Sequence, residues 1–194
     1  MKVVAGIQKG RRLKQPVTPG LRPTSAKVRE AMFGILGARV QDAKVLDLFA
    51  GTGALGLEAL SRGAQTVMFV DHAPASLRVL QDNILRCASK ETSLVIRQDV
   101  RRFLQTFPSP NQADQFDLIF VDPPYHTGEV EFVLDLLGGT TILSPRGILV
   151  MEHFHKEKVA NQTGGLKQYR QARYGDTILT FFSMKSDQQG SSCA

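Results

Sequence analysis

The chain has 194 residues, of which 42% are hydrophobic, so it is long enough for one globular domain with a buried core. No apolar run is long enough for a membrane span and no apolar signal core is present, so we expect a cytoplasmic protein. The two cysteines, Cys87 and Cys193, lie far apart, which argues against a disulfide framework, and two cysteines are too few for a zinc ribbon.

The net charge of +6 is concentrated in one part of the chain. Residues 1–39 carry nine basic side chains and one acid, Glu30, a charge of +8 that leaves −2 for the remainder. This separation predicts a polyanionic partner, although a solvated charged surface would have the same composition. The nine basic residues are Lys2, Lys9, Arg11, Arg12, Lys14, Arg22, Lys27, Arg29 and Arg39.

The first part of the chain predicts a hairpin followed by a helix. Lys2 to Ile7 and Arg11 to Lys14 have the composition of two short strands around a turn. After a turn-rich connection, Thr24 or Ser25 can cap a helix that ends near Leu36. One face of this helix would be apolar, with Val28, Met32, Ile35 and Leu36.

From Lys44 onward, hydrophobic runs alternate with helical segments, a pattern that predicts a parallel, doubly wound sheet. A terminal hairpin is expected around Gly175 and Asp176, and the polar residues 186–194 are expected to be disordered. The expected strands are 45–50, 66–71, 93–98, 116–121, 147–152, 167–174 and 177–185. The expected helices include 57–62, 74–87, 100–106 and 128–137.

A glycine loop follows the first of these parallel strands. Gly51, Gly53 and Gly56 fit the pattern G-x-G-x-x-G between a strand and a helix, which is the context of a nucleotide-binding loop. Asp71 ends the next strand about twenty residues later, where a carboxylate can accept both hydroxyls of a ribose. We therefore expect Gly51, Gly53 and Asp71 to bind a cofactor that contains a nucleoside.

Two further acids narrow the choice of cofactor. Asp47 precedes the glycines, where it would repel the pyrophosphate of a dinucleotide but could neutralise the ammonium group of an amino acid. Asp99 ends the third strand, where it could bond an adenine amino group or cap the following helix, and the two roles are compatible. A nucleoside triphosphatase is excluded because the chain has no G-x-x-x-x-G-K-[ST].

Asp122, Pro123, Pro124 and Tyr125 follow the strand 116–121, at the edge where open α/β sheets bind ligands. Prolines donate no N–H, an ionised carboxylate accepts hydrogen bonds, and a phenol ring can stack on a planar base. The tetrapeptide can therefore hold an exocyclic amino group, although a plain turn has the same residues. Together with Asp47, it points to S-adenosylmethionine and to methyl transfer onto nitrogen.

We expect the four histidines to act neither as metal ligands nor as catalysts. Glu152, His153 and His155 resemble metal ligands, but no other cluster joins them, and we expect no metal. Glu152 could be structural or could support the site. His72 and His126 adjoin the expected site as wall or surface residues, because a methylated amine loses its proton without a strong base.

Four motifs, in this order, resemble those of a known family. They are similar to the motifs of the RsmD-type bacterial 16S ribosomal RNA guanine-N2 methyltransferases, over about residues 1–185. Asp-Pro-Pro-Tyr also occurs in adenine-N6 and glutamine-N5 methyltransferases, whereas the basic hairpin and Arg-Pro-Thr-Ser narrow the resemblance. The motifs are Arg22-Pro23-Thr24-Ser25, Leu46 to Gly56, Asp122-Pro123-Pro124-Tyr125 and Tyr174-Gly175-Asp176-Thr177.

The resemblance implies a class I methyltransferase, with a Rossmann-like, mainly parallel sheet of seven strands in the order 3-2-1-4-5-7-6. Residues 1–39 would form a hairpin and helix extension, and residues 40–185 the methyltransferase domain. The implied reaction is methylation of the N2 amine of a guanine by S-adenosylmethionine. The implied partner is 16S ribosomal RNA or the small ribosomal subunit, and we expect a monomer.

The expected residue roles follow from this reaction. Asp122 and the Pro123 carbonyl would accept the amino hydrogens, and Tyr125 would stack on the base. Arg11, Arg12 and Arg22 are expected to contact phosphates.

Two alternatives remain open. The first is methylation of adenine N6 in DNA or of a protein amide. The basic segment disfavours a protein substrate but not DNA. The second is a non-catalytic nucleotide- or RNA-binding module, or a dehydrogenase.

Overall fold

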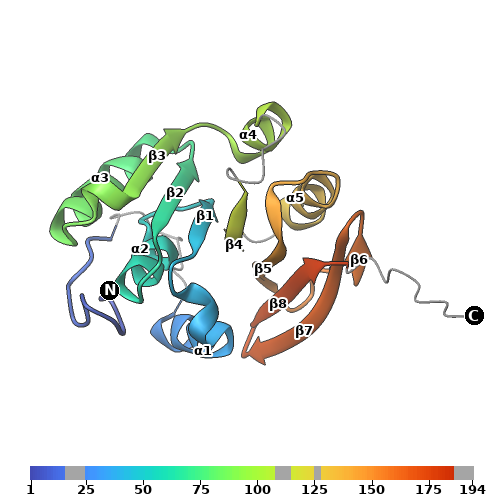
Figure 1. Cartoon of the computed structure of the whole chain (residues 1–194), viewed down its shortest axis with the longest axis horizontal. Helices are drawn as coiled ribbons and strands as arrows, with labels where there is room; N and C mark the ends of the chain where they lie inside the picture. The colour runs from blue at the N-terminus through green and yellow to red at the C-terminus, as the bar shows by residue number, and fades with distance from the viewer. Residues whose placement is uncertain (16–24, 108–114, 125–127, 186–194) are drawn as a thin grey trace, which may run out of the picture.

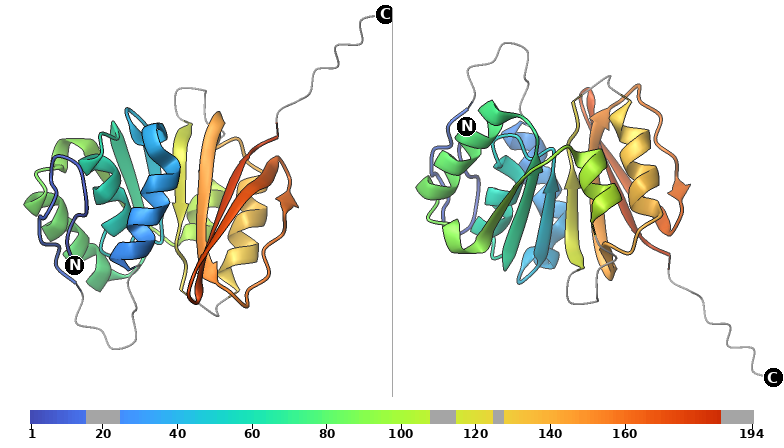
Figure 2. Two further views of the ribbon diagram at one scale, coloured as in Figure 1. Left: turned by 90° about the horizontal axis from the view of Figure 1, so that it is seen from below. Right: turned by 90° about the horizontal axis from the view of Figure 1, so that it is seen from above.

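Figure 1 shows a computed structural model of the chain, which describes residues 1–15, 25–107, 115–124 and 128–185. These residues contain one eight-stranded sheet in the order β3-β2-β1-β4-β5-β8-β7-β6, with helices on both faces (Figures 1 and 2). The strands are β1 Lys44–Leu48, β2 Thr66–Asp71, β3 Ser93–Arg97, β4 Phe116–Val121, β5 Leu143–Phe154, β6 Gln162–Thr163, β7 Leu166–Tyr174 and β8 Thr177–Met184.

The helices lie close to their predicted positions, and two begin at the expected caps. The Ser25 hydroxyl accepts a hydrogen bond from the Val28 N–H at 3.2 Å, and Asp99 accepts one from the Arg102 N–H at 3.1 Å. The described helices are α1 Ala26–Leu36, α2 Ala54–Ser61, α3 Pro74–Arg86, α4 Val100–Thr106 and α5 Glu129–Gly138. Two 3-10 turns, η1 Gly37–Val40 and η2 Lys90–Thr92, follow α1 and α3.

Strands β1 to β5 are parallel, as the hydrophobic runs predict, because helices cover both faces of this part of the sheet. The strand β1 pairs with β2 on one side and with β4 on the other. Chain order therefore reverses at β1 and β4, and this switch point is where doubly wound sheets bind ligands.

The last described strand lies inside the sheet. β8 runs antiparallel between β5 and β7, which confirms the expected terminal hairpin and the expected order. The strand β6 pairs with β7 and adds an eighth strand, so the predicted number of seven was one too low. Two residues are too short to show an alternating pattern, which is why the sequence did not reveal β6.

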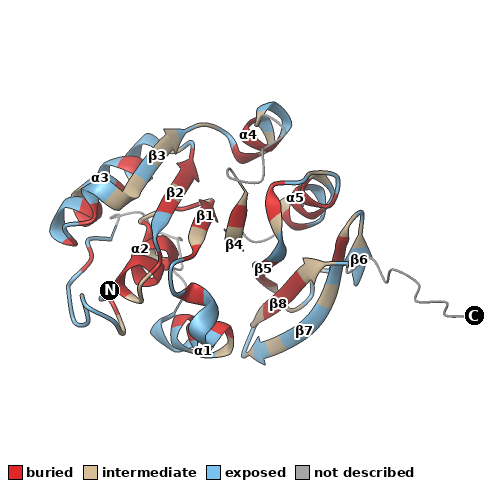
Figure 3. Ribbon diagram, viewed as in Figure 1, coloured by how far each residue is buried: buried red, intermediate tan, exposed pale blue. Residues whose placement is uncertain are grey.

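Two hydrophobic layers hold the molecule together, one on each face of the sheet. Figure 3 shows buried residues, in red, on the central strands and on parts of the helices that cover them. The layer under α1, α2 and α3 includes Val45, Phe69 and Phe120. The layer under α4 and α5 includes Leu46 and Val121. Neighbouring strand residues thus point to opposite faces and are buried on both.

Residues 1–15, which we call the arm, pack into the first layer through Val3 and Leu13. The prediction of two strands in the arm is wrong in extent, because a single antiparallel bridge joins Lys2 to Arg12. The N–H groups of Val4 and Ala5 donate to the Glu58 carboxylate instead, at 2.7 and 3.0 Å. Backbone hydrogen bonds still join the two sides of the arm, from the N–H groups of Val3 and Leu13 to the carbonyls of Arg11 and Met1, at 3.0 and 2.9 Å.

Candidate functional site

Three carboxylates lie together at the carboxyl ends of β2, β1 and β4. Asp71 ends β2, Asp122 follows β4, and Asp47 lies on β1 between them. Asp47 is 1% exposed, and burial raises its pKa well above the ordinary value. The charges of Asp122 and Asp71 raise this pKa further, so the three groups lie within electrostatic range of one another. A cation is the ligand that such an arrangement favours.

Asp47 also has a structural role. Its Oδ2 accepts a hydrogen bond from the Gly56 N–H at 2.9 Å, and this bond partly opposes the effect of burial on its pKa. Gly56 lies in the first turn of α2, so the carboxylate fixes the start of this helix against β1. The predicted contact of Asp47 with an ammonium group stays a prediction.

The Asp71 carboxylate shapes the glycine loop. Its Oδ2 accepts from the Gly51 N–H at 2.8 Å, and its Oδ1 accepts from the Ala73 N–H at 2.8 Å. Gly51 has a positive φ of 55°, a conformation that favours glycine. The loop that follows β1 is thereby held against the end of β2.

The three glycines of the loop have different surroundings. A Cβ atom at Gly51 would meet only the Phe49 carbonyl oxygen, 3.8 Å away. A Cβ atom at Gly53 would lie 2.3 Å from Leu80 Cδ1, and one at Gly56 would lie 2.3 Å from Phe69 Cε1. A side chain at Gly53 would therefore enter the core, while the predicted contact of Gly53 with a cofactor stays a prediction. Gly51 is the glycine that faces open space.

The segment after β4 begins with a half-buried Asp122, a buried Pro123 and an exposed Pro124. Tyr125 and His126 lie outside the described residues. Immediately beyond them, Glu129 at the start of α5 forms an ion pair of 2.9 Å with Arg101 of α4.

The Arg101 guanidinium also lies over the Phe132 ring, 4.2 Å from its centroid. These two contacts hold α4 against α5 beside the candidate site. Arg101 and Glu129 were not identified from the sequence, because their separation along the chain gives no local signal.

Asp99 and His72 are exposed residues at the same edge of the sheet. The helix-capping alternative for Asp99 is confirmed by its bond to the Arg102 N–H, while its contact with an adenine amino group stays a prediction. His72 directly follows Asp71, as expected for a surface residue next to the site.

The basic side chains in residues 1–39 are not all exposed to solvent. Arg11 and Arg12 are exposed, as a phosphate contact requires, and Arg22 lies outside the described residues. Arg29 is fully buried, and its Nη2 donates to the Lys2 carbonyl at 2.9 Å. Burial lowers the pKa of Arg29, and the charge of Glu58 opposes this effect. Arg29 is one of the nine basic residues on which the predicted polyanionic partner rested, and its burial shows that it does not contribute an exposed charge. Its position among the apolar residues of α1 was the available signal.

Two buried polar residues that were not singled out from the sequence fasten the arm. Glu58 of α2 accepts from the Arg62 Nε at 2.8 Å as well as from the arm. Asn83 of α3 accepts from the Lys14 N–H at 2.7 Å and donates to the carbonyls of Lys14 and Thr52 at 3.1 and 3.0 Å. Both residues lie within otherwise apolar helix faces, which was the available signal. Thr52 belongs to the glycine loop, so Asn83 links this loop to the arm.

The group that resembled metal ligands has structural contacts. The His153 ring is buried, with 3.1 Å to the Phe154 carbonyl and 2.9 Å to the Thr180 hydroxyl. Burial lowers the pKa of His153, and His155 lies 3.6 Å from Asp176. Glu152 is buried beside them. Across the described ranges, we find neither a metal-ligating group of three such side chains nor a helix long and apolar enough to cross a bilayer.

The doubly wound sheet with an antiparallel β8, the glycine loop after β1 and Asp-Pro-Pro after β4 define the class I methyltransferase fold. Residues 1–183 match the family described as Conserved hypothetical protein 95, and the chain belongs to this family. The resemblance to the RsmD-type family is thereby confirmed.

Curated relatives and solved structures agree with this assignment. The chain is 35% identical over 154 residues to Ribosomal RNA small subunit methyltransferase D of Haemophilus influenzae, covering 78% of each protein. It is 33% identical over 187 residues to the Escherichia coli K12 protein of the same name, covering 89% of this chain and 91% of the relative. The solved structure of a hypothetical protein from Thermus thermophilus, TTHA0928, superposes with a TM-score of 0.81 at 26% identity, covering 95% of this chain and 99% of that one.

Proposed function

We propose that the protein uses S-adenosylmethionine to methylate the exocyclic N2 amine of a guanine in 16S ribosomal RNA. The observation that carries this proposal is the position of Asp122 beside the Asp47–Asp71 pair at the switch point of the sheet. An acceptor for an amine and an acidic site for a cationic cofactor thereby share one edge. Two relatives whose names specify ribosomal RNA small subunit methyltransferase support the choice of substrate.

The residues present fit this cofactor. S-adenosylmethionine carries a sulfonium and an ammonium group, and the Asp47 carboxylate would lie where it can neutralise the ammonium group. An ionised carboxylate has about four lone-pair sites, so Asp71 can accept two ribose hydroxyls besides its two backbone N–H groups. Gly51 leaves space for close approach, and Asp99 would bond the adenine amino group. When bound, the cofactor supplies an electrophilic methyl group.

The chain's own groups would position the acceptor. Asp122 and the Pro123 carbonyl accept the two amino hydrogens of guanine, which directs the nitrogen lone pair toward the methyl group. Pro124 stiffens the segment, and Tyr125 stacks on a base that has left its helix. The methylated nitrogen then loses a proton, for which no strong base is needed.

The exposed cations of the arm would hold the RNA. Arg11 and Arg12 contact phosphates in this proposal, together with Arg22. The buried thiol of Cys87 is free and burial raises its pKa, which suits the reducing cytoplasm in which we place the protein.

The test is single-turnover methyl transfer from labelled cofactor to a 16S RNA transcript and to the assembled small subunit, with digestion of the product to nucleosides. We expect N2-methylguanosine from the parent and a rate at least about 100-fold lower for Asp122→Ala, with cofactor affinity nearly unchanged. Glu91→Ala, which removes an exposed acid of η2, is the control and should react like the parent. Methylated adenine or a labelled protein would establish one of the alternatives instead.

A further inference from the structure

Positive charge returns in the last part of the chain. Residues 40–142 carry eight basic and 13 acidic side chains, whereas residues 143–194 carry seven basic and four acidic ones. The charge of −2 outside residues 1–39 is therefore an acidic centre of −5 and a basic end of +3. The strand β7 carries three of these cations and no acid: Lys167, Arg170 and Arg173.

A β-bulge in β7 exposes an aromatic side chain among these cations. Gln168 pairs with Phe182 and Arg170 with Phe181, so Tyr169 is the extra residue between them. Bulges redirect side chains, and Tyr169 is 51% exposed although its ring lies 6.2 Å from the buried Phe181 ring. The core thus supports one side of the tyrosine, and solvent reaches the other.

Two arginines from other elements contact each other, and the charge of one of them, Arg39, acts on this tyrosine. Arg39 of η1 donates from Nη1 to the Arg146 carbonyl at 3.2 Å, and both arginines line a hollow of about 250 Å³. Asp42 and Asp117 also line the hollow, but the Asp117 carboxylate already accepts from the Lys44 N–H and the Ser144 hydroxyl.

The electrostatics of Tyr169 agree with this placement. Partial burial raises its pKa, and the charges of Arg39 and Arg170 act in the opposite direction, so both cations lie within range of the phenol.

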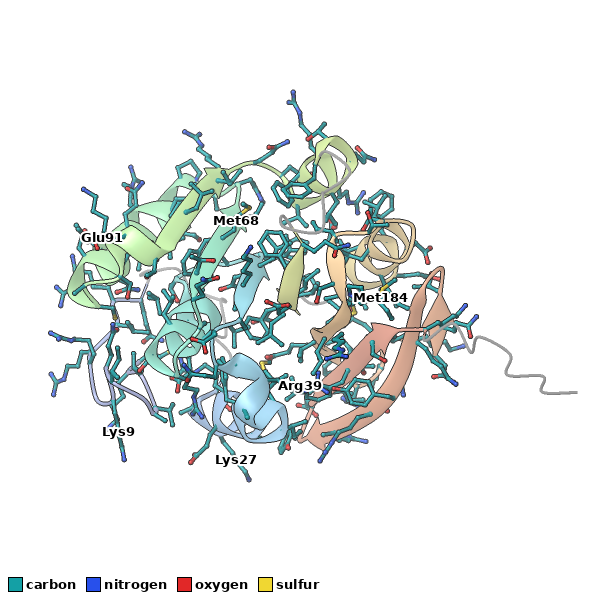
Figure 4. The ribbon with its side chains drawn as sticks, viewed as in Figure 1. Lys9, Lys27, Arg39, Met68, Glu91 and Met184 are labelled. Carbon is teal, nitrogen blue, oxygen red and sulfur yellow. The ribbon has the colours of Figure 1, made fainter. Side chains whose placement is uncertain are left out.

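This surface continues the basic surface of the arm. Figure 4 shows Lys9 of the arm and Lys27 of α1 at the lower edge of the molecule, with Arg39 of η1 between α1 and the hairpin of β7 and β8. Lys27 and Arg39 are exposed, and Glu30 is the one acid within α1. A polyanion bound to the arm could therefore follow this edge as far as β7.

We propose that Arg39, Tyr169 and Arg170 form a second RNA contact, in which the arginines bind phosphates and the tyrosine stacks on a base outside the target nucleotide. This inference rests on the proposed function, since it assigns more of the RNA to the same enzyme. Exposed aromatic rings beside cations are the usual platform for unpaired bases.

The distance to the methylation site defines the kind of RNA required. Arg170 of β7 pairs with Phe181 of β8, which pairs with Val150 of β5, and Val150 pairs with Phe120 of β4, two residues before Asp122. The contact thus lies three strands away from β4, which at ~4.8 Å per strand is roughly 14 Å or more. An RNA that reaches both must extend well beyond the target nucleotide, so we expect long transcripts to bind more tightly than short stem–loops.

Binding measurements over a range of salt concentrations test the contact. The variants are Arg39→Gln/Arg170→Gln, Tyr169→Ala and Tyr169→Phe, measured with a full-length 16S RNA transcript and with a short stem–loop that contains the methylated guanine. The double variant should flatten the salt slope on the transcript by about 1.4, for two contacts on unpaired RNA. Tyr169→Ala should weaken binding about tenfold and Tyr169→Phe should bind like the parent. None of these variants should change binding of the stem–loop.

The control is Lys90→Gln/Arg97→Gln, which removes two exposed cations at the opposite end of the sheet. If Arg39→Gln/Arg170→Gln has the same salt slope as this control, the proposal is overturned. So does weaker binding to the assembled small subunit alone, with unchanged binding to naked transcript, because the partner would then be a protein. Failure of the parent to methylate both the transcript and the assembled small subunit would refute the proposed function, whereas these binding measurements do not depend on methyl transfer.

Discussion

Gly51 and Gly53 are alike in sequence, yet the structure predicts different consequences when each is replaced by alanine. Both have a positive φ, 55° and 78°, which costs an L-residue about 1–2 kcal/mol. At Gly53 the new methyl group would also lie 2.3 Å from Leu80 Cδ1, and overpacking of this kind costs about 1–3 kcal/mol. Gly53→Ala should therefore lower the free energy of unfolding by about 2–5 kcal/mol, and Gly51→Ala by only about 1–2 kcal/mol.

Cofactor binding should show the opposite order. The Cβ atom at Gly51 occupies the open space where we place the cofactor, whereas the one at Gly53 displaces core side chains. Urea denaturation gives the two stabilities, and calorimetry with S-adenosylhomocysteine gives the affinities of the folded variants. We expect Gly51→Ala to lose most cofactor affinity while it stays folded. Equal stability losses, or parental cofactor affinity in Gly51→Ala, would refute this division of roles.

Three further predictions concern single side chains. The folded-state pKa of Asp47 is raised, so this residue favours the folded state at low pH, and that contribution is lost as pH rises through the raised pKa. Asp47→Asn should therefore increase the free energy of unfolding at neutral pH, measured by urea denaturation. The same substitution should weaken cofactor binding. Glu58→Ala leaves Arg29 buried without its opposite charge and should lower the free energy of unfolding by about 3–5 kcal/mol in the same assay. The double variant Glu58→Ala/Arg29→Met should regain part of this loss. Tyr125→Phe should keep most methyl transfer, whereas Tyr125→Ala should weaken RNA binding by about 1–3 kcal/mol in filter binding.

Local patterns were sufficient for most of the fold. The parallel strands are continuous hydrophobic runs, and Ser25 and Asp99 mark the starts of helices because their side chains satisfy backbone N–H groups locally. The positions of Asp71 and Asp122 at strand ends also follow from the sequence, since parallel strands end at one edge.

Hydrogen-bond partners that lie far apart along the chain could not be predicted from the sequence. Asn83 and Glu58 could be recognised as polar residues in apolar helices, but nothing local shows that they bind backbone groups 69 and 54 residues away. The same limit applies to Gly53, where the sequence indicates a close approach but not whether a cofactor or Leu80 makes it.

The place of β8 in the sheet has a consequence for biosynthesis. Among the described strands β8 comes last in the chain, yet it lies between β5 and β7 and contributes Phe181 and Phe182 to the two hydrophobic layers. Until it has been translated, β5 keeps an open edge and both layers lack a phenylalanine, and such edges promote aggregation. The growing polypeptide therefore completes its sheet only after Met184 has left the ribosomal exit tunnel.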